Sequence, residues 1–394
     1  MTWMRRSTSG LSFATPTPRD VLRFAIAAFA LCIPCAAVAT AQTPTFDGVV
    51  YAQHGTNELK LDIHLPTTGT APYPAVFWIH GGSWRTGSRV GIGVSAGLLE
   101  RGIAVVSVDY RLTQSGWEGV DLLWPAQIHD VKGAVRFIRA NAATYSIDPN
   151  RLGAWGPSSG AHLATILAMT ANDPFLEGDT GGNLSFSSHV SCAVDYYGPT
   201  NLMRLALDVT DPPGADGDHD APWAGEAQLI GWDQPGQGIG DVRANEDNPN
   251  APYPELVAAV VSASPVTYPS ADDPPLFIAH GTDDSAYPIL QSEALAQACA
   301  AAGMVYEYHA VPGAGHGSLG GVTNRAAWDF VVSHLRDPCP SDLDQSGLVD
   351  FQDLNLVLLH WGTSHATSDI NGDGGVDFDD LIELLAAWSA GCSP

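Results

Sequence analysis

The sequence predicts an α/β fold, in which a mostly parallel sheet has helices on both faces, followed by a small all-α domain. Three observations lead to this prediction. Short apolar runs alternate with runs of helical periodicity, a pattern typical of parallel sheets. The glycine-flanked turn Gly156-Pro157-Ser158-Ser159-Gly160 joins one such strand to one such helix. After Pro338-Cys339-Pro340 the chain is rich in aspartate and contains no lysine or arginine, which marks a separate module over residues 338–394.

The first 41 residues have the features of a signal peptide. Arg19 and Arg23 precede an apolar run over residues 24–38, and Ala39-Thr40-Ala41 has the small residues of a cleavage site. We therefore expect the mature protein to begin near Gln42 and to be secreted, whether extracellular, cell-surface or periplasmic. An uncleaved membrane anchor is the alternative, but the apolar run of about 15 residues is shorter than the roughly 20 that cross a bilayer.

The charge of the chain argues against two classes of partner. The formal net charge is −26, and Lys60 and Lys132 are the only lysines. Such an acidic surface repels nucleic acid and anionic membranes. We therefore expect neither nucleic-acid binding nor stable membrane insertion.

Four cysteines follow the predicted signal peptide, and an even number in an exported chain suggests disulfides. Cys339 and Cys392 bracket the C-terminal module and are expected to pair. That leaves Cys192 to pair with Cys299, or both to remain separate buried thiols.

The strands and helices of the first domain, residues 42–337, follow one another in order. An antiparallel pair over residues 49–54 and 59–65 opens the sheet. A helix is predicted over residues 125–141, because the apolar side chains recur at helical spacing and fall on one face. Further strands are predicted from apolar runs at residues 75–79, 103–110, 151–155, 192–197, 276–279 and 305–310. Further helices are predicted at residues 161–168, 291–302 and 325–335.

Ser158 is the candidate nucleophile. The turn that carries it has the G-x-S-x-G pattern, between the strand over residues 151–155 and the helix over residues 161–168. A serine on such a sharp turn points its hydroxyl outward, and the helix N-terminus faces any anion that forms there. The N–H of Ser159 is therefore one candidate oxyanion donor.

A serine nucleophile needs a base and an orienting carboxylate, in the chain order Ser, Asp, His. His316 lies in Gly313-Ala314-Gly315-His316-Gly317, between the last strand and the last helix, and is the candidate base. The sequence His280-Gly281-Thr282-Asp283-Asp284 follows another strand and offers two carboxylates. We favour Asp284 over Asp283 as the third member.

The loop His80-Gly81-Gly82-Ser83-Trp84 follows an early strand, and its small residues let the backbone approach a substrate. Gly82 is the expected second oxyanion donor, with Ser83 as a further one. Aromatic candidates for an acyl pocket are Trp84, Tyr197, Trp223 and Tyr287.

Residues 208–254 interrupt the alternation of strands and helices. The segment is rich in Pro, Gly, Asp and Asn and follows a strand end, where loops of such folds shape the site. We interpret it as a lid-like insertion over the active site. A solvated surface loop is the alternative.

These motifs together resemble the α/β-hydrolase esterases, and most closely the bacterial feruloyl and acetyl esterases near the hormone-sensitive-lipase-like branch. The resemblance covers roughly residues 49–336. It implies a triad of Ser158, Asp284 and His316 with no catalytic cofactor, and structural roles for Asp109 and Arg111. The further motifs that carry it are Val108-Asp109-Tyr110-Arg111, Asp148-Pro149-Asn150-Arg151 and Ser264-Pro265-Val266.

Two acidic loops in the C-terminal module have the spacing of calcium sites. Oxygen side chains recur at loop positions 1, 3, 5, 9 and 12, with glycine at 6 and a backbone carbonyl at 7. Helix-like runs follow at residues 354–361 and 381–388. The predicted ligands are Asp342, Asp344, Ser346, Leu348, Asp350 and Asp353 in the first loop, and Asp369, Asn371, Asp373, Gly375, Asp377 and Asp380 in the second.

The duplicated loop-helix pattern resembles a dockerin. That resemblance implies attachment to a cohesin, and another cell-surface partner is the alternative.

Taken together, the residues predict a secreted serine carboxylesterase that removes feruloyl or acetyl groups from polysaccharide or related esters. An amidase or peptidase with the same triad is one alternative. A catalytically inactive hydrolase-fold protein that serves binding or adhesion is another.

Overall fold

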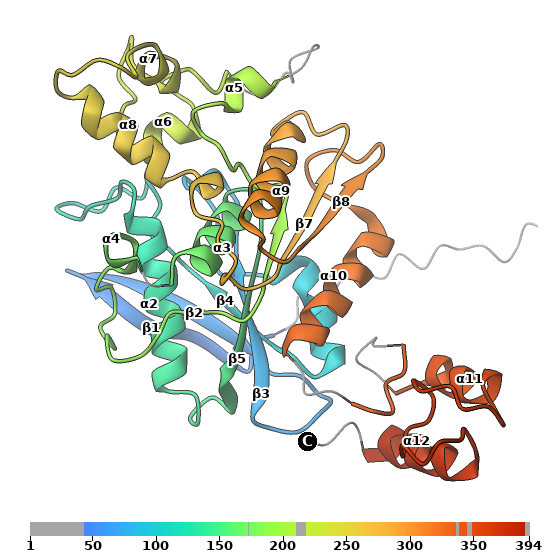
Figure 1. Ribbon diagram of the computed structural model, residues 1–394. Helices are drawn as coiled ribbons and strands as arrows, with labels where there is room; N and C mark the ends of the chain where they lie inside the picture. The colour runs from blue at the N-terminus through green and yellow to red at the C-terminus, as the bar shows by residue number, and fades with distance from the viewer. Residues whose placement is uncertain (1–42, 172, 210–217, 336–338, 345–348, 391–394) are drawn as a thin grey trace, which may run out of the picture. The chain divides into compact units, whose positions relative to one another are not determined.

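An eight-stranded sheet, with strand order β1-β2-β4-β3-β5-β6-β7-β8, organises the fold (Figure 1). The computed structural model describes residues 43–171, 173–209, 218–335, 339–344 and 349–390. The β1–β2 and β2–β4 pairings are antiparallel, and all later pairings are parallel. The strands are β1 (Phe46–His54), β2 (Asn57–His64), β3 (Tyr73–Ile79), β4 (Ala104–Val108), β5 (Ile147–Pro157), β6 (Ala193–Tyr196), β7 (Leu276–Gly281) and β8 (Tyr306–Val311).

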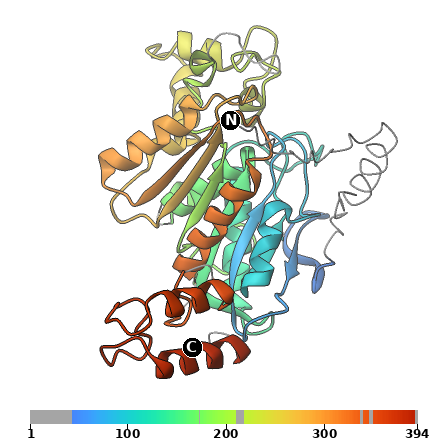
Figure 2. The same ribbon diagram turned by 90° about the vertical axis from the view of Figure 1, so that its right-hand side faces the viewer.

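Helices cover both faces of the sheet and bury a separate core on each. One core includes side chains of α2, α3 and α9, and the other includes side chains of η1 and α10. Figure 2 views the face that carries η1 and α10. The bounds are η1 (Gly93–Arg101), α2 (Ala126–Ala140), α3 (Ser159–Met169), α9 (Leu290–Ala302) and α10 (Gly320–Leu335), with the single turn α4 (Pro174–Glu177) between α3 and β6.

The continuous apolar run of β3 explains why this strand lies inside the sheet. Phe77 and Ile79 belong to one core, whereas Val76 and Trp78 belong to the other. Successive side chains of a strand point to opposite faces, so a strand covered on both sides must be apolar throughout. The predicted strands and helices of this domain are all confirmed. The helix η1 was not predicted, because no helical pattern was recognised in its sequence.

In the segment between β6 and β7, the described residues 205–209 and 218–262 form a helical cap, and the name cap refers to these residues below. It lies at the end of the sheet toward which β7 and β8 point (Figure 1). Its apolar side chains, among them Leu229 and Val260, join the core of α2 and α3, which a solvated loop would not do. The insertion therefore continues beyond the expected end at residue 254. Its helices are α5 (Leu205–Asp208), α6 (Gly225–Leu229), α7 (Ile239–Ala244) and α8 (Tyr253–Ser262), and η2 (Pro265–Thr267) follows.

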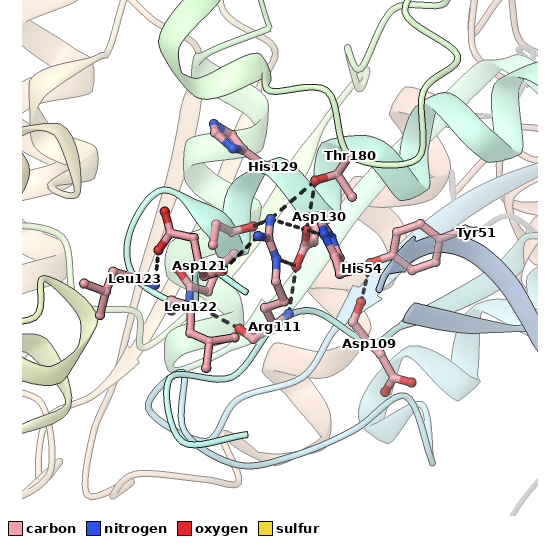
Figure 3. A network of polar contacts seen from close by, with 12 residues as sticks. Tyr51, His54, Asp109, Arg111, Asp121, Leu122, Leu123, His129, Asp130 and Thr180 are labelled. Atoms are coloured by element: carbon pink, nitrogen blue, oxygen red, sulfur yellow. Dashed lines mark hydrogen bonds and ion pairs between the residues drawn. The ribbon is translucent and has the colours of Figure 1, made fainter. Parts of the chain in front are cut away.

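A buried ion pair connects the end of β4 to α2 (Figure 3). Arg111 Nε and Nη2 donate to the two carboxylate oxygens of Asp130 at 2.8 and 2.7 Å. Thr180 also donates to Asp130, at 3.1 Å. Asp109 accepts from Arg89 through both backbone and side chain. These contacts give Asp109 and Arg111 the structural roles that the resemblance implies, since a buried charge persists only when it is paired.

Of the two alternatives for Cys192 and Cys299, the structure supports separate thiols, because both are free and buried. Cys192 packs in the core with η1 and α10, whereas Cys299 packs in the core with α2 and α3. The sheet therefore separates them. Burial raises the pKa of each thiol to about 12, which keeps both protonated. Cys339 is disulfide-bonded, and its expected partner Cys392 lies outside the described residues.

The C-terminal module contains α11 (Phe351–Leu359) and α12 (Phe378–Ala390). Its small core is formed by Leu343, Val357, Val376 and Leu384. The predicted signal peptide and the predicted boundary at residue 338 lie outside the described residues. Within the described part of the chain, no helix combines the length and the apolar character that crossing a membrane requires.

Candidate active site

Ser158 lies between the end of β5 and the start of α3, in a backbone conformation that side chains rarely adopt. Its φ is 56° and its ψ is −127°. The neighbouring glycines explain how the turn closes. A Cβ atom on Gly160 would lie 2.0 Å from the carbonyl oxygen of Ile79, and one on Gly156 would lie 2.3 Å from the carbonyl carbon of Gly160. Both positions therefore exclude any larger residue, and the strained turn is over-determined by its surroundings.

The structure brings His316 and Asp284 together. His316 Nδ1 lies 2.8 Å from Asp284 Oδ2. A carboxylate can only accept, so Nδ1 carries the proton and Nε2 is left as the base. His316 and Ser158 line the same cavity, with no direct hydrogen bond between them among the described residues. Such contacts are often long before a substrate binds.

The environment of Asp284 keeps it ionised. Its Oδ1 accepts from the N–H groups of Ala286 and Tyr287, each at 2.9 Å. His280 Nε2 lies 3.2 Å from its Oδ2. Burial alone would raise the pKa of Asp284, but the hydrogen bonds from His280 and His316 outweigh burial and hold this pKa well below its usual range.

The neighbouring aspartate, Asp283, is exposed and accepts a hydrogen bond from the Thr282 hydroxyl at 2.9 Å. It is therefore Asp284 that is positioned to orient the base, as the sequence favoured.

The loop after β3 runs beside the nucleophile. A Cβ atom on Gly81 would lie 2.9 Å from the carbonyl oxygen of Pro157 and 3.4 Å from the Cβ of Ser158. Gly82, Ser83 and Trp84 all have positive φ, at 119°, 54° and 58°. Among the described residues, nothing accepts a hydrogen bond from the N–H of Gly82 or Ser83. Both groups thus remain available as oxyanion donors, together with the N–H of Ser159 at the start of α3.

Neighbouring aromatic and histidine side chains hold this loop in place. His80 stacks on Tyr110 at a ring distance of 4.3 Å, and the Tyr110 hydroxyl donates to the His80 carbonyl at 2.9 Å. Trp84 Nε1 donates to His162 Nδ1 at 3.3 Å. These contacts give His80 the bracing role that the sequence suggested.

The cavity at Ser158 has a volume of about 520 Å³. Two of the four predicted aromatic residues line it, namely Trp223, which is 66% exposed, and Tyr287. The prediction is wrong for Trp84, which is fully buried because the positive φ values turn its indole into the core. It is also wrong for Tyr197, which is buried and packs edge-on against the His316 ring at 4.6 Å, outside the cavity lining.

Charged residues of the cavity wall were missed from the sequence. Arg85, Asp218, His219 and Glu226 line the cavity beside Ser83 and Ser158. Three of them come from the cap, which has no recognisable periodicity. Arg85 follows the oxyanion loop directly, which is the one signal that could have indicated it.

Each acidic loop of the C-terminal module gathers three carboxylates within 4.8 Å of one another: Asp342, Asp344 and Asp353 in the first, and Asp373, Asp377 and Asp379 in the second. Such oxygen-only sets suit calcium. Ser346 and Leu348 lie outside the described residues.

The carboxylates at loop position 12 make the same contacts in both loops. Asp353 accepts from the N–H groups of Leu343, Asp344 and Asp350. Asp380 accepts from those of Ile370, Asn371 and Asp377. These two aspartates therefore fix the loop backbone, a role that the sequence prediction did not include. Asp379, which the prediction omitted, joins the carboxylates of the second loop.

Comparison with known proteins gives a family model that matches more than half of the chain, and several esterases with similar sequences. The family model BD-FAE matches residues 61–299, a segment that includes Ser158 and Asp284. A probable carboxylic ester hydrolase of Mycobacterium tuberculosis, LipM, is 31% identical over 235 residues, which cover 58% of this chain and 44% of the relative. The chain spans about half the length of the curated relatives it matches.

Solved structures give longer matches. A truncated carbohydrate esterase from gut microbiota is 30% identical, with a TM-score of 0.61, over 75% of this chain and 98% of that one. The native esterase Est2 of Thermogutta terrifontis shares the fold, at 24% identity and a TM-score of 0.54, over 74% and 92% of the two chains. The chain has an α/β-hydrolase sheet with a strained turn at Ser158, and the family model matches more than half of its length. This chain therefore belongs to the BD-FAE family.

Proposed function

We propose that this protein is a secreted serine carboxylesterase that removes feruloyl or acetyl groups from polysaccharide or related esters. One observation carries the proposal. Ser158, on its strained turn, lines the same cavity as His316, and His316 is hydrogen-bonded to Asp284.

The mechanism follows from the roles that these atoms can take. Ser158 Oγ attacks the ester carbonyl while His316 Nε2 accepts its proton, and Asp284 holds the imidazole in the productive tautomer. The N–H groups of Gly82, Ser83 and Ser159 stabilise the oxyanion. His316 then donates the proton to the departing alkoxide. Water, deprotonated by His316, attacks the acyl-serine ester, which releases the carboxylic acid and restores Ser158. This sequence needs no cofactor.

Two further observations support the substrate class. The gut-microbiota structure that the chain matches over most of its length is titled a carbohydrate esterase. Trp223 presents an exposed indole at the cavity, and Arg85 Nη1 donates to its carbonyl oxygen at 3.3 Å. An exposed indole in the lining of the cavity that contains Ser158 suits stacking against a sugar face or a feruloyl ring.

The C-terminal module has a separate role in this proposal. Its two acidic loops bind structural calcium, and the module attaches the enzyme to a cohesin or another cell-surface partner. The paired carboxylate sets support calcium, and the aspartate-rich composition with no lysine or arginine supports a module distinct from the catalytic domain.

The first experiment compares hydrolysis of methyl ferulate, p-nitrophenyl acetate and an acyl p-nitroanilide by the purified protein, with Ser158→Ala as the blank. Serine-dependent turnover of both esters would support a feruloyl-type esterase, and turnover of acetate alone an acetyl esterase. Turnover of the anilide alone would favour the amidase alternative. A wild-type rate no higher than the Ser158→Ala rate on all three would contradict the proposal and favour an inactive binding protein.

A further inference from the structure

Three buried polar side chains line the active-site cavity but take no part in the proposed mechanism. His219 and Glu226 come from the cap, and Tyr287 follows the catalytic aspartate by three residues. Each is no more than 9% exposed. Burying a carboxylate and an imidazole beside a nucleophile is costly unless they are paired, so the contacts of these groups indicate what they do.

Glu226 connects the other two side chains. The Tyr287 hydroxyl donates to Glu226 Oε1 at 3.1 Å. The other carboxylate oxygen of Glu226 lies 3.4 Å from His219 Nδ1. The rings of His219 and Tyr287 stack on one another at 5.3 Å. One carboxylate of the cap therefore fixes both a residue of the cap and a residue of the catalytic domain.

The second nitrogen of His219 reaches the same catalytic loop. His219 Nε2 lies 2.9 Å from the carbonyl oxygen of Ala286. A carbonyl and a carboxylate can only accept, so His219 donates from both nitrogens and is an imidazolium. Burial lowers the pKa of His219, but the hydrogen bond and charge of Glu226 outweigh this and raise the pKa above its ordinary value. His219 and Glu226 thus form a charged pair within the cap, and each contacts the loop: His219 donates to the Ala286 carbonyl and Glu226 accepts from the Tyr287 hydroxyl.

The residues that the cap holds are the ones that hold the catalytic acid. The N–H groups of Ala286 and Tyr287 donate to Asp284 Oδ1. His280 Nε2 contacts the Tyr287 carbonyl at 2.9 Å from the other side. The Tyr287 ring also packs against His316 at 5.4 Å. Movement of Ala286 or Tyr287 would therefore turn the carboxylate that orients the base.

We propose that Glu226 is a positioning residue, which holds the 284–287 loop through Tyr287 and His219 and so fixes the orientation of Asp284 toward His316. This inference rests on the proposed function. It gives the cap a part in catalysis besides lining the cavity, because a cap that is not closed leaves the catalytic acid unsupported.

The test compares Glu226→Ala and Glu226→Gln, with Glu255→Ala on the exposed surface of α8 as the matched control. Removing the carboxylate is expected to lower kcat by roughly ten- to a hundred-fold, as small misplacements of catalytic groups do, with little change in KM. Glutamine should restore most of kcat, because its oxygen still accepts from Tyr287 and its amide can donate to a neutral His219. Glu255→Ala should match the wild type.

A double-mutant comparison separates positioning from other roles. In an Asp284→Asn background, Glu226→Ala should lower kcat no further, because its effect passes through Asp284. If Glu226→Ala fails to fold, Tyr287→Phe removes the hydroxyl that donates to Glu226 but keeps the His219 contacts, so it should show a smaller loss of kcat, again with little change in KM.

Three results would overturn this inference: a rise in KM at constant kcat, an unchanged kcat in both the Glu226→Ala and Tyr287→Phe proteins, or a full effect that persists in the Asp284→Asn background. Equal rates for the wild type and Ser158→Ala would contradict the proposed function itself.

Discussion

Two adjacent aspartates after β7 differ in their local contacts, and this difference supports the proposed role of only one of them. Asp284 accepts hydrogen bonds from His316 and from two backbone N–H groups, whereas Asp283 is exposed and accepts one from the Thr282 hydroxyl. Asp284→Asn should lower kcat on p-nitrophenyl acetate by roughly a thousand-fold or more, because the amide favours the wrong tautomer of the base. Asp283→Asn is the matched control and should stay close to the wild type. Comparable losses in the two variants would contradict this assignment.

His162 gives the protein a dependence of stability on pH. It is fully buried, its Nε2 lies 2.7 Å from the carbonyl oxygen of Ala263, and its Nδ1 accepts from Trp84. Burial lowers the pKa of His162 to about 4, although the Ala263 carbonyl and the charge of Glu226 oppose the shift. The unfolded chain, with a histidine pKa of about 6.5, then binds the proton more readily.

The contribution of His162 is therefore complete above pH 6.5 and is lost as the pH falls toward 4, by about 3 kcal/mol. We expect the free energy of unfolding in urea to fall more steeply between pH 7 and pH 4.5 in the wild type than in His162→Gln. The comparison of the two slopes removes the contribution of carboxylates that both proteins share. Parallel slopes would show that His162 does not titrate in this way.

At the scale of elements, the cap and the oxyanion loop contribute to the site through their packing. Trp84, at the end of the oxyanion loop, donates to His162 on α3, and α3 begins directly after Ser158. The ring of His162 also contacts the carbonyl of Ala263, just beyond α8. One buried histidine thus connects the oxyanion loop, the helix that follows Ser158 and the end of the cap.

The two loop-helix units of the C-terminal module lead to a prediction about calcium. Their carboxylate sets lie within 4.8 Å, where like charges repel unless a cation is bound. Calcium at a hundred-fold excess over its Kd should raise the free energy of unfolding of the module by about 2.7 kcal/mol per site. Chelation of calcium should remove this stabilisation. The measurement is a second, calcium-dependent thermal transition by circular dichroism, which Asp342→Asn with Asp369→Asn should abolish. Turnover of p-nitrophenyl acetate should be unaffected by chelation, and a transition insensitive to calcium would contradict the site.

At the scale of the whole molecule, the sheet could be predicted because its inner strands, such as β3, β4 and β7, are mostly apolar runs that alternate with helices along the chain. The proximity of His316 to Asp284, and the cavity that His316 shares with Ser158, could be predicted because each of the three residues lies in a glycine-containing loop after a strand, where the carboxyl ends of parallel strands meet. The numbers of residues between Ser158, Asp284 and His316 in the sequence do not show how far apart the three side chains lie in space. The topology of the sheet does, because it brings the loops that follow its parallel strands to one edge.

The cavity walls could not be predicted in the same way. His219 and Glu226 lie in a segment without periodicity, so their positions depend on how the cap packs against the catalytic domain. Trp84 was misassigned because its place in the sequence, after Gly82 and Ser83, reveals neither its positive φ nor the burial of its indole. The sequence left open whether Cys192 pairs with Cys299 for a related reason, since only the packing of the two cores shows that the sheet separates them.

The scarcity of lysine has a practical consequence. Lys132 is fully buried and donates to the Thr170 carbonyl and to Glu177, whereas the side chain of Lys60 on β2 is 36% exposed. Of the two lysines in the chain, a reagent in solution therefore reaches one. Amine-directed coupling would therefore attach a support or a fluorophore at Lys60 or at the α-amino group, and would leave Lys132 unmodified.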